Sequence, residues 1–223
     1  MTTMSNVSTN VSISSCSSTD INHSELQPFF RDHELFAEYK LLCNNVPSGV
    51  YVVPSFKSLQ VWHGMIFIKI GMFADGCFKF NLYIPDNFPY ARPSLRFITP
   101  VFHPQVKSTG ELNLAKAFPT WTPRKDRIWH ILRYTKRCFF SINTFDATNP
   151  VAAESVHKSI DTFRSQAKLC VERSIKLFDK NEQNDITPGD DGNVFNVNLL
   201  PSTELQKMKE RVLAGVKAPF SVP

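Results

Sequence analysis

The residues that could take part in chemistry are concentrated in one segment, 102–123, which reads FHPQVKSTGELNLAKAFPTWTP. Its polar groups are the imidazole of His103, the carboxamides of Gln105 and Asn113, and the hydroxyls of Ser108 and Thr109. A histidine can act as a general base, and a carboxamide N–H can stabilise an oxyanion. A carboxamide nitrogen is not a useful nucleophile because its lone pair is delocalised into the carbonyl. No histidine and acid are arranged to activate either hydroxyl, so we expect hydrogen bonding here, with His103 in a structural role.

The five cysteines are the other residues that could react, and they are widely scattered. Cys43, Cys77 and Cys138 lie at apolar positions of predicted elements, so we expect them to be small buried hydrophobic residues. Cys16 lies in a polar N-terminal stretch, and Cys170 follows much later in the chain. No C-x-x-C spacing exists, which indicates neither a zinc site nor a disulfide framework. We expect no metal and no cofactor.

The elements that must position this segment follow from hydrophobic periodicity. The pattern predicts a helix over 29–43, then strands over 50–53, 59–70, 77–84 and 94–98 joined by short loops as an antiparallel meander. Helices follow over 126–140, 151–163 and 166–178. Strands grouped before helices indicate an α+β domain.

Individual positions on these elements are predicted to face the core. The set is Leu35, Phe36, Tyr39, Leu42 and Cys43 in the first helix; Trp62, Gly64, Ile66, Ile68 and Ile70, then Phe78, Phe80, Leu82 and Ile84 in two strands; and Ile128, Ile131, Leu132, Thr135, Cys138 and Phe139 in the second helix. Asp126 or Thr122 is the predicted N-cap of that second helix.

The two ends of the chain differ from the middle in composition. Residues 1–24 are rich in Ser, Thr and Asn, so we expect a disordered tail. Residues 25–180 form the predicted domain, and residues 181–223 form a polar linker followed by an amphipathic helix over 203–216. This helix is a candidate partner-binding element, although packing against its own domain is the alternative. Its apolar face holds Leu205, Met208, Val212, Leu213 and Val216.

The charge pattern bears on the classes of partner and on the compartment. The net charge is +5, with the densest basic cluster between Arg124 and Arg137. This cluster predicts a solvated helix face, with an acidic partner or membrane surface as the alternative. No nucleic-acid recognition motif accompanies it, so we expect no nucleic-acid partner. The most apolar run, 65–72, is too short to span a membrane. The first 24 residues lack the pattern of a secretory signal, which predicts a cytoplasmic protein and leaves the nucleus open.

A series of motifs, in order and at consistent spacing, resembles the ubiquitin-conjugating enzyme family over about 34–178. The motifs are Trp62-His63-Gly64, Ile84-Pro85-Asp86-Asn87-Phe88-Pro89, Arg92-Pro93-Ser94, Phe102-His103-Pro104, Trp121-Thr122-Pro123 and Asn149-Pro150. The resemblance implies that family's fold. Asn113 falls where the family has its catalytic cysteine, and Gln105 falls where it has the asparagine of a His-Pro-Asn motif. This combination is similar to the catalytically inactive fused toes (Akt-interacting) subgroup, which includes the insect crossbronx proteins.

The resemblance implies a function without catalysis. His103, Pro104, Gln105 and Asn113 would form a degenerate site with no nucleophile, and the protein would be an adaptor that binds other proteins. In the subgroup, the implied partners are Hook-type coiled-coil adaptors in vesicle trafficking. Two alternatives remain open at this point. One is a cofactor of an active conjugating enzyme that binds ubiquitin weakly and non-covalently, and the other is an enzyme with a different nucleophile.

Overall fold

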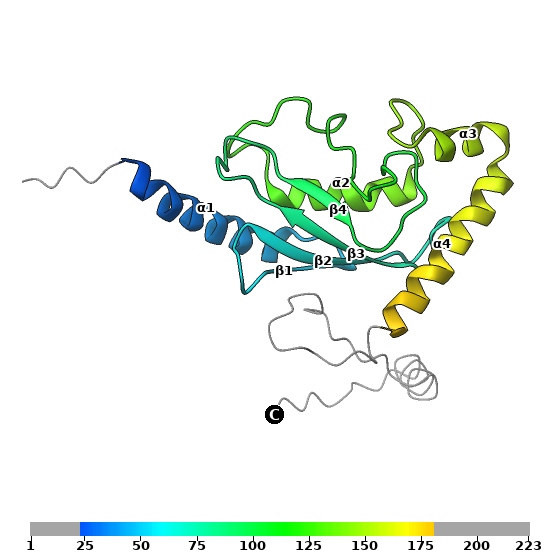
Figure 1. The fold of residues 1–223 in the computed structure, drawn as a ribbon, viewed down its shortest axis with the longest axis horizontal. Helices are drawn as coiled ribbons and strands as arrows, with labels where there is room; N and C mark the ends of the chain where they lie inside the picture. The colour runs from blue at the N-terminus through cyan, green and yellow to red at the C-terminus, as the bar shows by residue number, and fades with distance from the viewer. Residues whose placement is uncertain (1–22, 181–223) are drawn as a thin grey trace, which may run out of the picture.

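The computed structural model describes residues 23–180, and eight helices and strands follow one another within that range (Figure 1). Their order is α1 (His23–Asn45), β1 (Val50–Pro54), β2 (Val61–Phe67), β3 (Cys77–Tyr83), β4 (Ser94–Phe97), α2 (Ile128–Phe140), α3 (Pro150–Lys158) and α4 (Ile160–Lys180). Four strands therefore precede three helices, as predicted, and the α+β fold class is confirmed.

The strands form one antiparallel sheet in the order β1-β2-β3-β4, which is the predicted meander. Gly64 of β2 lies opposite Phe80 of β3, and a Cβ atom at Gly64 would lie 2.2 Å from the Phe80 ring. Glycine is therefore required there because the aromatic ring crosses over the neighbouring strand. Figure 1 shows α2 lying along the sheet, with α1 at one end and the α3–α4 pair at the other.

The core lies between the sheet and α2. All six residues predicted to face the core from α2 are buried. The predicted residues Phe78, Phe80 and Leu82 of β3 are also buried, and so is Ile84, which follows the strand. Aromatic rings fill much of the space: the Phe78 and Phe139 rings are stacked with centroids 5.0 Å apart, and Phe73 meets Phe139 edge-on at 5.2 Å. The hydrophobic pattern predicted these buried positions correctly because regular elements form both sides of the contact.

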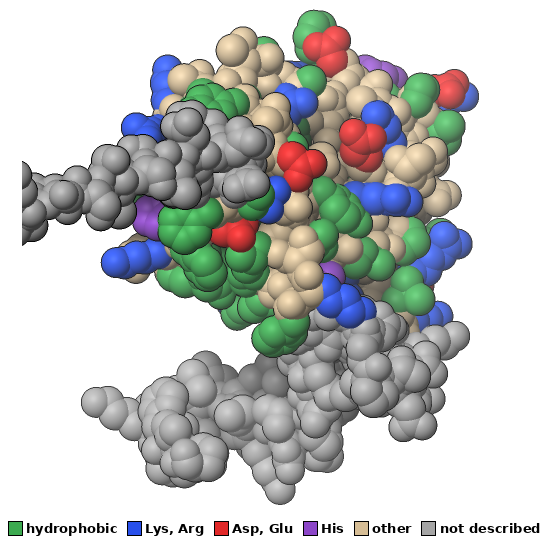
Figure 2. Space-filling view, turned by 60° about the vertical axis from the view of Figure 1, so that its left-hand side comes forward, with side chains coloured by type: hydrophobic (Ala, Val, Ile, Leu, Met, Phe, Trp, Pro, Cys, Tyr) green, Lys and Arg blue, Asp and Glu red, His purple; other side chains and the backbone are tan. Residues whose placement is uncertain are grey.

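Helix α1 differs from its prediction in its start and in its buried face. It begins at His23 rather than at residue 29 and therefore includes Pro28. Phe36 is 62 % exposed and Cys43 is also exposed, so both predictions of burial are wrong. Glu38 is buried in their stead. Figure 2 shows that hydrophobic side chains gather on the surface seen from this end of the molecule.

Strand β2 is shorter than predicted, because it ends at Phe67 rather than at residue 70. Ile68 is still buried, but Ile70 is 68 % exposed, so its predicted place in the core is wrong. The chain turns away from the sheet immediately afterwards at Gly71, whose φ of +93° is in the left-handed region. The alternation of side chains ends where the strand ends.

The start of α2 also differs from its prediction. The N-cap is Arg127, whereas the Asp126 carboxylate accepts a hydrogen bond from the Thr122 N–H at 2.8 Å. The first backbone N–H of the helix, at Ile128, donates instead to the carboxylate of Glu38 in α1, at 3.1 Å. That carboxylate also accepts from the Arg127 guanidinium at 2.6 Å. An acidic group near a helix N-terminus is favoured by the helix dipole, and here the group comes from 90 residues away in the chain.

Within residues 23–180, none of the helices combines the length and the apolar character that crossing a lipid bilayer requires.

Candidate functional site

The segment that carries the candidate site joins β4 to α2 and is ordered by backbone pairing. Isolated bridges join Arg96 to Glu111 and Val106 to Leu112. The Asn113 N–H then donates to the Gln105 carbonyl at 2.8 Å. This folded-back path brings Gln105 and Asn113 together, although they are eight residues apart in sequence.

The His103 ring is buried and both of its nitrogens are bonded to backbone groups. Its Nδ1 accepts from the Gln105 N–H at 3.0 Å, so its Nε2 carries the proton and donates to the Cys138 carbonyl of α2 at 3.0 Å. The rings of Phe73 and Phe139 lie beside it, at 6.1 and 6.2 Å between centroids. Burial lowers the pKa of His103 from 6.5 to about 4, with the Cys138 carbonyl opposing the change. The neutral ring therefore joins the loop to α2 and faces no solvent-accessible space in which it could act as a base.

This low pKa predicts a loss of stability on acidification. Below pH 6.5 the unfolded chain takes up a proton at His103, whereas the folded chain does not until about pH 4. The free energy of unfolding should therefore fall by roughly 3 kcal/mol between pH 6.5 and pH 4 from this residue. Urea denaturation at a series of pH values measures it. The variant His103→Gln should show a correspondingly flatter profile, and an equal slope in both proteins would contradict the assignment.

The side chains of Gln105 and Asn113, here called the amide pair, use their N–H groups in hydrogen bonds to other groups of the protein. The Gln105 Nε2 donates to the carbonyls of Asn143 and Phe145, each at 3.0 Å, and its Oε1 accepts from the Asn113 Nδ2 at 3.2 Å. The Asn113 Nδ2 also donates to the Asp146 carbonyl at 3.2 Å. Each amide nitrogen has two hydrogens, so neither amide group has a donor left for a reacting oxygen.

The segment 143–146 is held over the amide pair by these bonds and by further contacts. The Asn113 Oδ1 accepts from the Ala115 N–H at 3.1 Å, which orients the Asn113 side chain. The Lys116 ammonium lies 4.9 Å from the Phe145 ring centroid, a cation–π contact. Pro104 joins the same region through its carbonyl, which accepts from the N–H groups of Thr148 and Asn149 at 2.9 and 3.0 Å. His103, Pro104, Gln105 and Asn113 are therefore brought together as one hydrogen-bonded region, with Gln105 only 2 % exposed.

The cysteines within the described residues do not replace a nucleophile at this site. Cys77 and Cys138 are buried, as predicted, and burial raises their thiol pKa values to about 12 and about 11. Burial also raises the pKa of the Cys170 thiol, which donates to the Pro100 carbonyl at 3.2 Å. A thiol of raised pKa is protonated at neutral pH and reacts poorly. Cys43 is exposed but lies on α1, away from the segment that carries Asn113.

Sequence reasoning missed the backbone groups that close this region. One site that it did predict lies outside the described residues. The carbonyls of Asn143, Phe145 and Asp146 complete the amide pair, and a backbone carbonyl leaves no signature in a sequence. The candidate partner-binding residues lie outside the described residues; they are Leu205, Met208, Val212, Leu213 and Val216.

Comparisons with known proteins bear on the family and the fold of the chain. Residues 34–171 match the family described as ubiquitin-conjugating enzyme. The AKT-interacting protein of Mus musculus is 43 % identical over 169 residues, which cover 73 % of this chain and 57 % of that protein. The AKT-interacting protein of Homo sapiens is 42 % identical with the same coverage. The chain thus spans a little over half the length of these curated relatives.

A solved structure with the same fold is the E2 domain of a Toxoplasma gondii ubiquitin conjugating enzyme. The superposition has a TM-score of 0.57 and covers 63 % of this chain and 96 % of that domain. Sequence identity is 24 %, so this likeness is one of fold alone.

Proposed function

The chain belongs to the ubiquitin-conjugating enzyme family, and from this premise we propose that it is a non-catalytic member that works as a protein-binding adaptor. The observation that carries the proposal is the amide pair. Asn113 stands at the position that the resemblance assigns to the catalytic cysteine, and both of its amide hydrogens are bonded to protein acceptors. Gln105, at the position of the supporting asparagine, is likewise bonded to two carbonyls. A thioester needs a thiolate, and no residue of this region supplies one.

The exposed surface at the α1 end of the domain supports protein binding. An apolar groove of about 450 Å³ lies between α1 and the β1–β2 hairpin. Phe36 and Phe56 border it and are 62 % and 94 % exposed, and buried Leu35 and Trp62 contribute to its floor. Large exposed aromatic side chains around a groove are characteristic of protein-interaction surfaces. This surface lies on a different part of the fold from the amide pair.

The second binding element in the proposal is the C-terminal segment 203–216, with the apolar residues Leu205, Met208, Val212, Leu213 and Val216. An amphipathic helix of this kind can place its apolar face in a groove of a partner. We propose that this segment binds coiled-coil adaptors of the Hook type, in a complex for cytoplasmic vesicle trafficking. The domain within 25–180 would then be the folded body that this element accompanies.

Affinity capture from cells tests the adaptor proposal with the full chain. The double variant Leu205→Glu/Val212→Glu should capture about ten-fold less coiled-coil adaptor than the wild type. The reason is that burying two carboxylates in an apolar interface is strongly unfavourable. Thr203→Glu/Ala214→Glu adds the same charge on the side opposite the apolar face and should retain capture. Asn113→Cys should also retain it. Equal capture by both double variants would count against the C-terminal element, and dependence of capture on Asn113 would count against a non-catalytic role.

Non-covalent ubiquitin binding is the alternative function, and a titration of labelled ubiquitin followed by NMR distinguishes it. Shifts confined to one surface of ubiquitin, with capture of coiled-coil adaptors unaffected by the C-terminal variant, would favour the alternative.

A further inference from the structure

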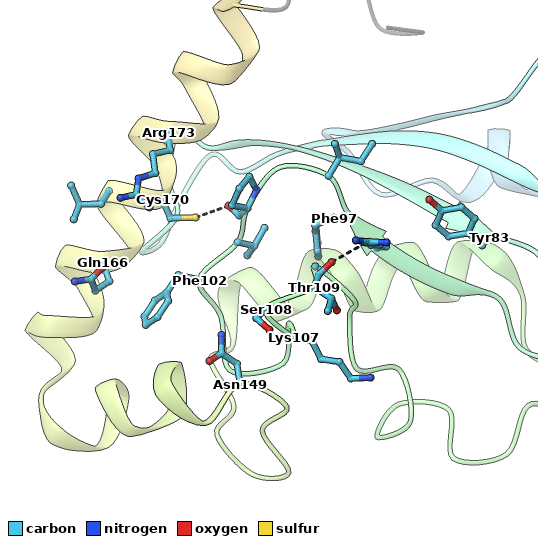
Figure 3. A pocket seen from close by; sticks show the side chains of 16 residues that line it. Tyr83, Phe97, Phe102, Lys107, Ser108, Thr109, Asn149, Gln166, Cys170 and Arg173 are labelled. Carbon is cyan, nitrogen blue, oxygen red and sulfur yellow. Dashed lines mark hydrogen bonds between the residues drawn. The ribbon is translucent and has the colours of Figure 1, made fainter. Parts of the chain in front are cut away.

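A second concave surface lies away from both the amide pair and the α1 groove, between α4 and the segment 96–110. It is a cleft of about 550 Å³, here called the α4 cleft (Figure 3). Its α4 wall is formed by Gln166, Leu169, Cys170 and Arg173. These positions are three, four and seven residues apart, so they share one face of the helix over about 10 Å of its length.

The charged groups of the α4 cleft are all positive. Its lining includes Arg96, Lys107 and Arg173 and contains no aspartate or glutamate. Lys107 is partly neutralised by the Glu111 carboxylate, 2.8 Å from its ammonium. Arg96 and Arg173 are therefore the main cationic groups, and they come from β4 and α4, respectively. Figure 3 shows Arg173 on α4, across the cleft from Thr109, whose carbonyl is bonded to Arg96.

The Arg96 guanidinium is held in position. Its Nε–H donates to the Thr109 carbonyl at 2.8 Å, which orients the group. An arginine side chain has five N–H donors in a planar fork, so four remain for an anion. On the other side, the Cys170 thiol donates to the Pro100 carbonyl, and burial raises its pKa. That wall therefore carries no thiolate to oppose an anion.

Apolar side chains lie among these cations. Ile98 is 57 % exposed and Leu169 is 44 % exposed, and both line the cleft. Phe102 also lines the cleft, and its ring packs on the Phe163 ring with the two centroids 5.8 Å apart. A surface that offers both cations and exposed apolar groups suits a ligand that has an anionic group next to an apolar one.

We propose that the α4 cleft binds a short extended segment of a protein partner in which an acidic or phosphorylated side chain lies near an apolar one. The proposal rests on the adaptor function, since it supplies a further contact for a protein partner. An extended chain advances about 3.3 Å per residue, so the α4 wall accommodates about three residues. Arg96 on the β4 side and Arg173 on the α4 side are the two cations available to the anion, and Leu169 and Ile98 are the exposed apolar groups available to the apolar side chain.

Peptide binding to the full chain tests this inference. Three pools of 12-residue fluorescent peptides would be compared, each with glutamate, phosphothreonine or unmodified threonine fixed at the centre and leucine placed at each flanking position in turn. The glutamate or phosphothreonine pool should bind more tightly than the threonine pool, and the difference between the first two identifies the source of the anion. Binding should weaken as salt increases, because the attraction is electrostatic and partly exposed to solvent.

Variants on both sides of the cleft locate the binding. Arg173→Gln should weaken the best peptide by roughly ten-fold, the size expected when one charge-assisted hydrogen bond is lost. Arg96→Gln should have a similar effect from the opposite wall. Lys168→Gln removes one charge from α4 outside the lining and should change the affinity less than about two-fold.

Each other outcome would overturn the inference. No preference for the anionic pools, or affinity unchanged in both Arg173→Gln and Arg96→Gln, would show that the cleft is not a peptide site. Sedimentation with vesicles of phosphatidylcholine and phosphatidylserine, without peptide binding, would assign the cations to a lipid surface instead. If the peptide pools fail while affinity capture still depends on Leu205 and Val212, the cleft inference is wrong and the adaptor proposal stands.

Discussion

Purified wild-type protein is expected to form no adduct with ubiquitin in the presence of activating enzyme and ATP. The reason is chemical, because Asn113 offers a carboxamide at the position that the resemblance assigns to the reactive cysteine, and the reaction needs a thiolate. The buried cysteines of the described residues cannot substitute. Burial raises the pKa of Cys77 to about 12 and that of Cys138 to about 11, and it raises the pKa of Cys170 as well. The expected result is therefore the absence of both reducible and stable adducts on a non-reducing gel.

Two variants give this result its control. Asn113→Cys introduces the thiol alone, and Asn113→Cys/Gln105→Asn also restores the His-Pro-Asn motif. A reducible adduct in either variant would show that the surface that receives ubiquitin remains competent and that the loss is confined to these positions. An adduct on the wild-type chain would contradict the non-catalytic proposal, and Cys43→Ser would then test whether the exposed cysteine of α1 carries it.

The variant Glu38→Ala should lower the free energy of unfolding by about 3 kcal/mol. The Glu38 side chain is 2 % exposed and accepts from both the Arg127 guanidinium, at 2.6 Å, and the Ile128 N–H, at 3.1 Å. Its removal leaves the partly buried Arg127 guanidinium without its carboxylate partner and leaves the Ile128 N–H, at the start of α2, without an acceptor. Urea denaturation followed by circular dichroism measures the change.

The same helix supplies a matched control. Glu34 lies one turn earlier in α1 and pairs with Arg124 at 3.8 Å, where the Arg124 side chain is 77 % exposed. Exposed pairs of this kind contribute less than about 1 kcal/mol, so Glu34→Ala should have a small effect. Glu38→Gln keeps an acceptor for the Ile128 N–H and should fall between the two. Equal losses for Glu34→Ala and Glu38→Ala would show that Glu38 does not join α1 to α2 as described.

The comparison between α1 and α2 shows where sequence reasoning succeeds. The six core-facing positions of α2 were predicted correctly because its apolar stripe packs on one regular sheet face. In α1, by contrast, Phe36 is exposed and Glu38 is buried. Hydrophobicity alone cannot rank these two residues correctly, because the burial of Glu38 depends on Arg127 and Ile128 in a distant part of the chain.

The sequence by itself determined the α+β class, the antiparallel meander and the family. These follow from local periodicity and from residue spacing, both of which are present in the linear chain. Only the tertiary structure decided that His103 is held neutral between a loop and α2, and that Gln105 and Asn113 are bonded to the carbonyls of segment 143–146. It also placed Arg96 and Arg173 on two walls of one cleft. These contacts join residues that are distant in sequence and often involve backbone groups, which are the same in every residue and carry no sequence signal.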